Sequence, residues 1–262
     1  MRVFLIRHGE TVDNVAKLCA GTTDSALTNH GMIQIEALGR HFALSQIRVN
    51  TVFASDLSRA RITAEAICRH QIPLANQPRV TPILTDSLRE RHYGNMEGKS
   101  WIPSSAIADS GIETDMSMIQ RAKNFLNEHL LPLILDDPDR AGNVVIVAHG
   151  ILLRRLWNCI MELVHPADVH FASEKQLDAT IAARPAWSNT GVATIYLQRS
   201  WEAKARKPRT KTTLQGWSIT VLDVDNKDHL ANLTRTRGGI GSAAHDTKQK
   251  TMDRFFKRKK SS

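Results

Sequence analysis

Short apolar runs alternate along this chain with longer segments in which apolar residues recur every three or four positions. Residues 2–6 and 144–148 are compact runs rich in β-branched residues. The second is apolar throughout, which is typical of a central strand covered on both faces. Residues 51–54 and 83–85 predict two further short strands.

The segments between these runs carry the spacing of amphipathic helices. Residues 31–45 place Ile35, Leu38 and Phe42 on one face, and Thr28 precedes them as a candidate cap. Further helices are expected over residues 58–70, 116–135 and 152–163. Because strands and helices alternate, the pattern predicts a layered α/β fold.

The pattern changes in the last quarter of the chain. Residues 192–198 and 217–225 alternate like strands, and a basic insert at about 202–213 is expected to form a loop between them. From Asn232 onward there is little apolar periodicity, and glycines and charges predominate. We therefore expect one domain over residues 1–231 and a flexible basic tail over 232–262.

Charge supports this division. The net charge of the 262 residues is +9, and residues 201–262 alone hold 15 Lys and Arg against 6 acidic residues, so the first 200 residues are neutral overall. No apolar run approaches the roughly 18 residues of a membrane span, and Arg7 interrupts the first apolar run, where a signal peptide would continue. These features favour a soluble, intracellular protein. Three widely spaced cysteines fit neither a disulfide framework nor a zinc pattern.

The candidate chemistry begins where two apolar runs end. Residues 2–6 lead into Arg7-His8-Gly9, and residues 144–148 lead into His149-Gly150, so two strands deliver a histidine to the edge of a sheet. Phosphoryl transfer without a metal needs a nucleophile, positive donors around the phosphoryl oxygens and a proton donor. This chain can supply all three.

The blocks that carry this chemistry follow one another over roughly residues 1–198. They are Arg7-His8-Gly9-Glu10-Thr11 with Asn14; Asp24, Leu27-Thr28 and Gly31; Ser55-Asp56-Leu57-Ser58-Arg59-Ala60 with Thr63-Ala64-Glu65; Leu88-Arg89-Glu90-Arg91-His92-Tyr93-Gly94 with Gly98; Glu113-Thr114; and Val147-Ala148-His149-Gly150. In this order they resemble the histidine phosphatase superfamily, the phosphoglycerate mutase-like fold. The resemblance implies a three-layer α/β/α fold with a mostly parallel central sheet, and a phosphatase that needs no metal or other cofactor.

The resemblance also implies a role for each matching residue. His8 would be the nucleophile that becomes a phosphohistidine, and its second ring nitrogen must be held by a hydrogen bond so that the attacking one stays unprotonated. Arg7 and Arg59 would grip the phosphoryl oxygens, and His149 would complete the pocket. Glu90 would protonate the leaving group and then activate water.

Several alternatives stay open from sequence. Glu113 is a second carboxylate that could lie near the site, and Asn14, Arg91 and Asn189 are expected to contact the substrate. The block around Glu90 resembles the phosphoglycerate mutases, yet the stretch from Gly98 to Glu113 is far shorter than their capping insertion. A short cap leaves an open pocket, which favours hydrolysis over mutase-type transfer.

The tail contains a pattern of its own. Gln249, Met252, Phe255 and Phe256 resemble the motif by which proteins dock on the sliding clamp, proliferating cell nuclear antigen (PCNA), since one helical turn would present the three apolar side chains together. A different interpretation has Phe255 and Phe256 pack back onto the enzyme body. Basic residues 257–260 favour a location in nucleus and cytoplasm, mainly the nucleus, and weak nucleic-acid contact. A clamp-binding scaffold with a vestigial phosphatase fold is the alternative to an enzyme.

Overall fold

One twisted sheet organises the molecule. The computed structural model describes residues 1–73, 78–100, 111–136, 142–172, 185–202, 212–234 and 239–246. Within these ranges, seven strands form a sheet in the order β3-β2-β4-β1-β6-β7-β5, parallel throughout except where β6 pairs with β1 and β7. The strands are β1 Arg2–Arg7, β2 Thr51–Ser55, β3 Pro82–Thr85, β4 Asn143–Ala148, β5 Val169–Phe171, β6 Val192–Arg199 and β7 Trp217–Asn226.

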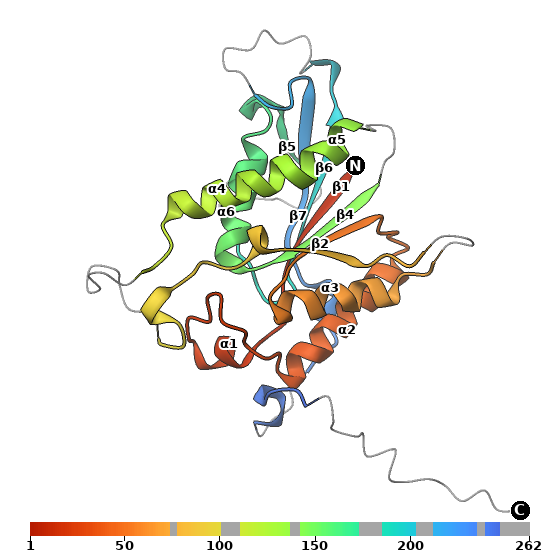
Figure 1. The fold of residues 1–262 in the computed structure, drawn as a ribbon. Helices are drawn as coiled ribbons and strands as arrows, with labels where there is room; N and C mark the ends of the chain where they lie inside the picture. The colour runs from red at the N-terminus through yellow and green to blue at the C-terminus, as the bar shows by residue number, and fades with distance from the viewer. Residues whose placement is uncertain are drawn as a thin grey trace, which may run out of the picture.

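Helices cover both faces of this sheet (Figure 1). The helices are α1 Val12–Ala16, α2 Asn29–Leu44, α3 Ser58–His70, α4 Asp115–Phe125, α5 Leu131–Asp136 and α6 Gly150–Met161. One buried cluster joins α2 and α3 to the sheet, and a larger one joins α4, α5 and α6 to its other face. The expected three-layer α/β/α architecture with a mostly parallel sheet is confirmed.

Strand β1 shows how the two layers fix the position of its end. Val3 and Leu5 pack in the cluster of α4 and α6, whereas Phe4 and Ile6 pack in the cluster of α2 and α3. All four side chains are at most 4% exposed, and burial of each contributes roughly 1.5–3 kcal/mol. The backbone that follows β1 therefore leaves the sheet at a well-defined point.

The long helix expected over residues 116–135 is interrupted. α4 passes into a π-helical turn, Leu126–Leu130, before α5, and the Leu131 N–H bonds to the Leu126 carbonyl five residues back. Pro132 explains the interruption, because it has no N–H to offer the Glu128 carbonyl and its ring would clash there. The other predicted helices and strands are present to within a few residues. Strand β5 was not predicted, since it is only three residues long and His170 and Phe171 are exposed.

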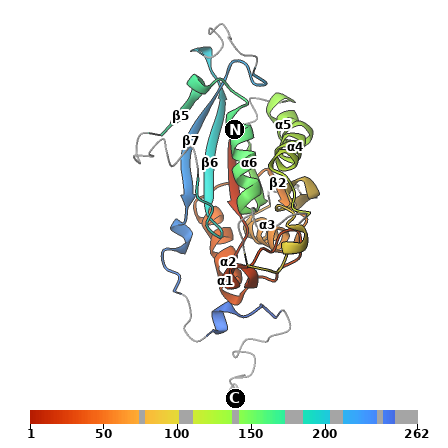
Figure 2. The same ribbon diagram turned by 90° about the vertical axis from the view of Figure 1, so that its left-hand side faces the viewer.

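Part of the segment expected to be a flexible tail is bonded to the domain (Figure 2). The Asn29 N–H donates to the Ala243 carbonyl over 3.0 Å, the His245 N–H donates to the Leu27 carbonyl over 2.9 Å, and Thr28 and Ala244 form an antiparallel bridge. Residues 239–246 therefore lie against the start of α2. Residues 203–211 of the basic insert lie outside the described ranges. Among the described helices, none is long and apolar enough to cross a membrane.

Candidate active site

Two histidines meet at the carboxyl ends of neighbouring strands. β1 pairs in parallel with β4 so that Arg7 lies opposite Ala148, and the His8 N–H donates to the Ala148 carbonyl over 3.1 Å. The rings of His8 and His149 follow directly, with centroids 5.0 Å apart. Both side chains are buried, at 3% and 0% exposed. The parallel register thus brings together two residues that lie 141 positions apart in sequence.

His8 is held in the protonation state that a nucleophile needs. Its Nδ1 lies 2.7 Å from the Gly9 carbonyl oxygen, which can only accept, so Nδ1 carries the proton and Nε2 keeps its lone pair. Burial lowers the pKa of His8 well below its usual value, and the charges of Arg59 and Arg7 lower it further. At neutral pH His8 is therefore an uncharged imidazole.

His149 and Arg7 carry buried polar atoms that have no hydrogen-bond partner in the part of the chain that the structure describes. Neither ring nitrogen of His149, nor Nε of Arg7, has a hydrogen-bond partner among the described residues, although all three atoms are buried. Burial, followed by the charge of Arg59, lowers the pKa of His149 well below its usual value. Arg7 is anchored through Nη1, which donates to the Trp187 carbonyl over 2.7 Å. Buried polar atoms without a partner are rare in folded proteins, and a functional role is one explanation for them.

Arg59 brings a second guanidinium whose charge acts on His8. It lies in the first turn of α3, is 1% exposed, and donates through Nη1 and Nη2 to the carbonyls of Thr23 and Gly21 over 2.8 and 2.6 Å. Thr63, one turn further along α3, accepts a hydrogen bond from the Gly9 N–H over 3.1 Å. Helix α3 therefore positions both the cation and the loop that carries His8.

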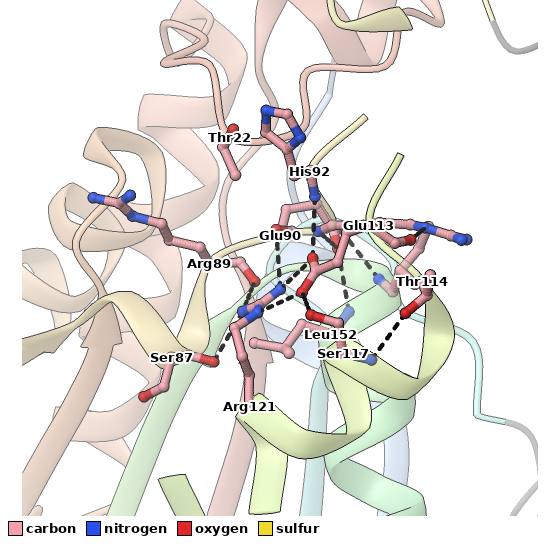
Figure 3. Close-up of polar contacts among 12 residues, drawn as sticks. Thr22, Ser87, Arg89, Glu90, His92, Glu113, Thr114, Ser117, Arg121 and Leu152 are labelled. Carbon is pink, nitrogen blue, oxygen red and sulfur yellow. Dashed lines mark hydrogen bonds and ion pairs between the residues drawn. The ribbon is translucent and has the colours of Figure 1, made fainter. Parts of the chain in front are cut away.

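Glu90 is held against the start of α6 (Figure 3). Its two carboxylate oxygens accept hydrogen bonds from the N–H groups of Arg91, Ile151 and Leu152 over 2.9, 3.2 and 3.2 Å. Because α6 begins immediately after His149, the same helix N-terminus fixes Glu90 relative to His149. These three backbone donors fix the position of the Glu90 carboxylate.

Arg121 of α4 supports the segment that carries Glu90 (Figure 3). Its Nη1 donates to the carbonyls of Ser87 and Arg89 over 3.1 and 3.0 Å, and its Nε and Nη2 hold both oxygens of Glu113 at 2.8 and 2.7 Å. Burial opposes ionisation of Glu113, but the hydrogen bonds from Arg121 and Ser117 prevail and lower its pKa. Glu113 is thus a paired carboxylate that holds Arg121, which makes Glu90 the better candidate for a proton donor.

A cavity of about 470 Å³ opens beside Glu90. Its walls come from the loop between α1 and α2, the segment around Glu90, and α4 with the π-helical turn that follows it. They are formed by Thr22, Thr85, Asp86, Ser87, Arg89, Glu90, His92, Glu113, Arg121, Asn124 and Glu128. The lining is largely polar, so the cavity suits a hydrated, polar group next to the candidate proton donor.

The three residues expected to contact the substrate, Asn14, Arg91 and Asn189, differ in their hydrogen-bond partners. Asn189 Nδ2 donates to the His8 carbonyl and to Asn14 Oδ1 over 3.1 and 3.0 Å, so both amides lie beside His8. Arg91 donates instead to the Glu113 carbonyl over 2.8 Å and lies 3.6 Å from Asp115. The structure therefore places Asn189, with Asn14 bonded to it, beside His8. Arg91 instead interacts with Glu113 and Asp115.

The described residues contain no cluster of three or more His, Cys, Asp or Glu side chains that could hold a metal ion. Residues 3–174 match the family model described as the histidine phosphatase superfamily (branch 1). The chain belongs to this superfamily.

The chain is similar to proteins named as phosphatases and to proteins named as phosphoglycerate mutases. The chain is 28% identical over 161 residues to a broad-specificity phosphatase of Saccharomyces cerevisiae, covering 60% of this chain and 68% of that one. It is 29% identical over 167 residues to a 2,3-bisphosphoglycerate-dependent phosphoglycerate mutase of a Methylobacterium species, covering 58% and 76%.

Solved structures share the histidine phosphatase fold. A mycobacterial protein described as hydrolase 1 superposes with a TM-score of 0.60 at 18% identity, covering 86% of this chain and 99% of that one. A mycobacterial glucosyl-3-phosphoglycerate phosphatase in complex with VO3 superposes with a TM-score of 0.56 at 23% identity, covering 77% and 92%. At these identities the likeness concerns the fold.

Sequence reasoning missed several residues that support the site. Arg121 lies in a helix whose apolar stripe was the visible signal, and no local pattern marks it as a partner of Glu113. Thr63 was visible only as part of a block, and Trp187 contributes a backbone carbonyl, for which sequence gives no signal. The docking pattern over residues 249–256, with Gln249, Met252, Phe255 and Phe256, lies outside the described residues.

Proposed function

We propose that this chain hydrolyses phosphomonoesters through a phosphohistidine on His8. The observation that carries the proposal is the 2.7 Å contact from His8 Nδ1 to the Gly9 carbonyl, which leaves Nε2 unprotonated in a ring that is influenced by the charges of Arg59 and Arg7. In the first step the Nε2 lone pair attacks phosphorus and the ester P–O bond breaks. The leaving oxygen takes the proton of Glu90.

The second step returns the enzyme to its starting state. A water molecule gives a proton to Glu90 and attacks phosphorus, the P–N bond breaks, and inorganic phosphate leaves while the electron pair returns to His8 Nε2. The first step needs the protonated form of Glu90, and the negative charge of the arriving phosphate favours that form. Arg7, Arg59 and His149 stabilise the oxygens in both transition states.

The nucleophile is tested with p-nitrophenyl phosphate. Wild-type protein should release p-nitrophenol, and His8→Ala should release none, while His170→Ala on the exposed edge strand β5 serves as the matched control. Denaturation during turnover of a radiolabelled phosphate ester should trap an acid-labile phosphoprotein in the wild type. Equal turnover by wild type and His8→Ala would exclude the mechanism, and no turnover by either would favour a scaffold with a vestigial site.

The proton donor is tested through the leaving group. Glu90→Gln should lose more activity on an alkyl phosphate, whose leaving alkoxide needs a proton, than on p-nitrophenyl phosphate, whose phenolate is stable. Glu113→Gln is the comparison for the second carboxylate. An equal loss on both esters would assign the proton donor elsewhere.

The short stretch between Gly98 and Glu113 favours hydrolysis over mutase-type transfer. The similar proteins include both phosphatases and mutases, so the two activities must be compared directly. Mutase activity is assayed with 3-phosphoglycerate and catalytic 2,3-bisphosphoglycerate. We expect release of inorganic phosphate to exceed isomerisation. The reverse ratio would make the chain a mutase.

A second proposal concerns a binding partner and the location of the protein in the cell. The pattern Gln249, Met252, Phe255 and Phe256 supports docking of the tail on the sliding clamp PCNA, mainly in the nucleus. Full-length protein should bind the clamp, the double variant Phe255→Ala/Phe256→Ala should not, and Arg254→Ala, at a position that the pattern leaves open, should bind as wild type. Undiminished binding by the double variant would refute docking, and an unchanged distribution of its fluorescent fusion in cells would refute the role of docking in location.

A further inference from the structure

The backbone at His8 is fixed by a turn from a distant part of the chain. The Thr190 N–H donates to the carbonyls of Arg7 and His8 over 3.0 and 3.3 Å, and the Asn189 side chain also donates to the His8 carbonyl. Thr190 is fully buried and has a φ of 57°. This left-handed conformation is rare for a β-branched residue, so surrounding contacts must hold it.

His229 supplies such a contact. It lies in a single 3-10 turn, Asp228–Leu230, that follows β7, and its Nε2 is 2.9 Å from the Thr190 hydroxyl oxygen. That hydroxyl is 2.7 Å from the Asn189 carbonyl, which can only accept. The Thr190 hydroxyl therefore donates to Asn189 and accepts from an N–H at His229 Nε2.

The surroundings of His229 agree with this tautomer. Its Nδ1 is buried and has no hydrogen-bond partner among the described residues, as expected for the unprotonated nitrogen of a neutral ring. The charged or titratable groups that face the ring are His41 of α2, with centroids 6.0 Å apart, and Asp228. Burial, followed by His41, lowers the pKa of His229 to about 4, against the opposing effect of Asp228.

We infer that His229 is a positioning residue of the active site, holding Thr190 and Asn189 in the turn that fixes the backbone of the nucleophile. The inference rests on the proposed function. His229 lies beyond residues 3–174, which match the family model, so this support is supplied by the C-terminal part of the chain. It acts through Thr190 and does not touch the reacting atoms.

The test is a double-mutant cycle on kcat for p-nitrophenyl phosphate. His229→Phe keeps a ring of similar size but has no donor, and it should lower kcat about 3- to 10-fold with little change in KM, as for loss of one hydrogen bond. His229→Gln carries an N–H at similar reach and should restore kcat to within about twofold of the wild type. His41→Phe, which removes the neighbouring ring, is the matched control.

The cycle is completed in a Thr190→Gly background. Glycine adopts positive φ without support and has no hydroxyl, so His229→Phe should have no further effect there. An equal penalty in both backgrounds, no penalty in the wild-type background, or failure of Gln to restore kcat would each overturn the inference. If His229→Phe does not fold, Thr190→Val breaks the same bond from the other side and should give the same loss of kcat; an unchanged kcat overturns it.

Failure of the proposed function can be distinguished from failure of the inference on His229. The His8→Ala comparison is made first, and if wild type and His8→Ala have equal activity the proposed mechanism fails. If activity depends on His8, the result of the double-mutant cycle tests only the positioning role of His229.

Discussion

Replacement of Arg121 by Met removes the central support of Glu90 while keeping a side chain of similar length. The side chain of Arg121 is 24% exposed and that of Glu113 is 12% exposed, so the pair is largely buried. Removing one member of a buried ion pair costs about 3–5 kcal/mol, mainly because the other charge is left unpaired. Since Arg121 keeps some contact with water, we expect the free energy of unfolding to fall by about 2–3 kcal/mol.

The same variant should affect catalysis. The carbonyls of Ser87 and Arg89 lose their shared donor, and a displacement of Glu90 by about 1 Å is enough to lower kcat about 100-fold. The expected melting temperature is about 4–12 °C below that of the wild type, at about 2–4 °C per kcal/mol. Calorimetry gives the melting temperature, and turnover of an alkyl phosphate at 20 °C, whose leaving group needs the Glu90 proton, gives kcat.

Two comparisons make the result interpretable. Arg154→Met, at an exposed position of α6, should change neither quantity. Adding Glu113→Gln to Arg121→Met removes the stranded charge and should recover part of the lost stability but not the activity, because Glu90 still lacks its support. Arg121→Met protein that melts within about 2 °C of the wild type and keeps its kcat would refute the assignment.

Three further predictions concern the buried groups around His8. Orthovanadate should raise the melting temperature of the wild type by binding at Arg7, Arg59 and His149, and Arg59→Met should abolish the shift; an equal shift in both would place the anion elsewhere. Because the folded-state pKa of His229 is about 4 and that of unfolded His is about 6.5, the unfolded state binds more protons between these values. Stability should therefore fall as the pH drops from about 6.5 to 4, and His229→Phe should show a shallower fall in the urea midpoint than the wild type; equal slopes would contradict the assignment. Gly31→Ala would place a Cβ 2.1 Å from the Glu10 carbonyl oxygen, so it should destabilise the fold by about 1–3 kcal/mol and lower kcat, whereas Gly142→Ala, whose nearest neighbour is 3.4 Å away, should do neither; a neutral Gly31→Ala would show that the loop after His8 can move freely.

Sequence patterns were most informative where local composition and tertiary role coincide. The run that ends at His149 is apolar because β4 is covered on both faces, so its position and its end were both visible. The pairing of β1 with β4 is not a local property, but two strands that end in His-Gly made it a reasonable expectation. Family blocks then indicated which side chains should gather there.

Sequence was least informative where a residue acts through a distant backbone group. Arg121 and His229 are ordinary residues in their own segments, and their importance comes from the carbonyls and the hydroxyl that the fold brings to them. The choice between Glu90 and Glu113 likewise depended on which carboxylate Arg121 neutralises. The interrupted helix could have been anticipated from Pro132, but the π-helical turn that accommodates it depends on packing.

The hydrogen bonds between residues 239–246 and the start of α2 also limit the distance between the enzyme and the first residue of the docking pattern, Gln249. Two residues lie between Asp246 and Gln249, and a fully extended chain covers at most about 11 Å over these three residue steps. A partner that takes residues 249–256 would therefore be tethered close to one face of the enzyme, the face where α2 begins and where Thr28 contacts Glu10. If residues 249–256 bind a partner as proposed above, this short connection would limit the directions from which the partner can approach, and it would raise the concentration of any substrate carried by that partner near His8.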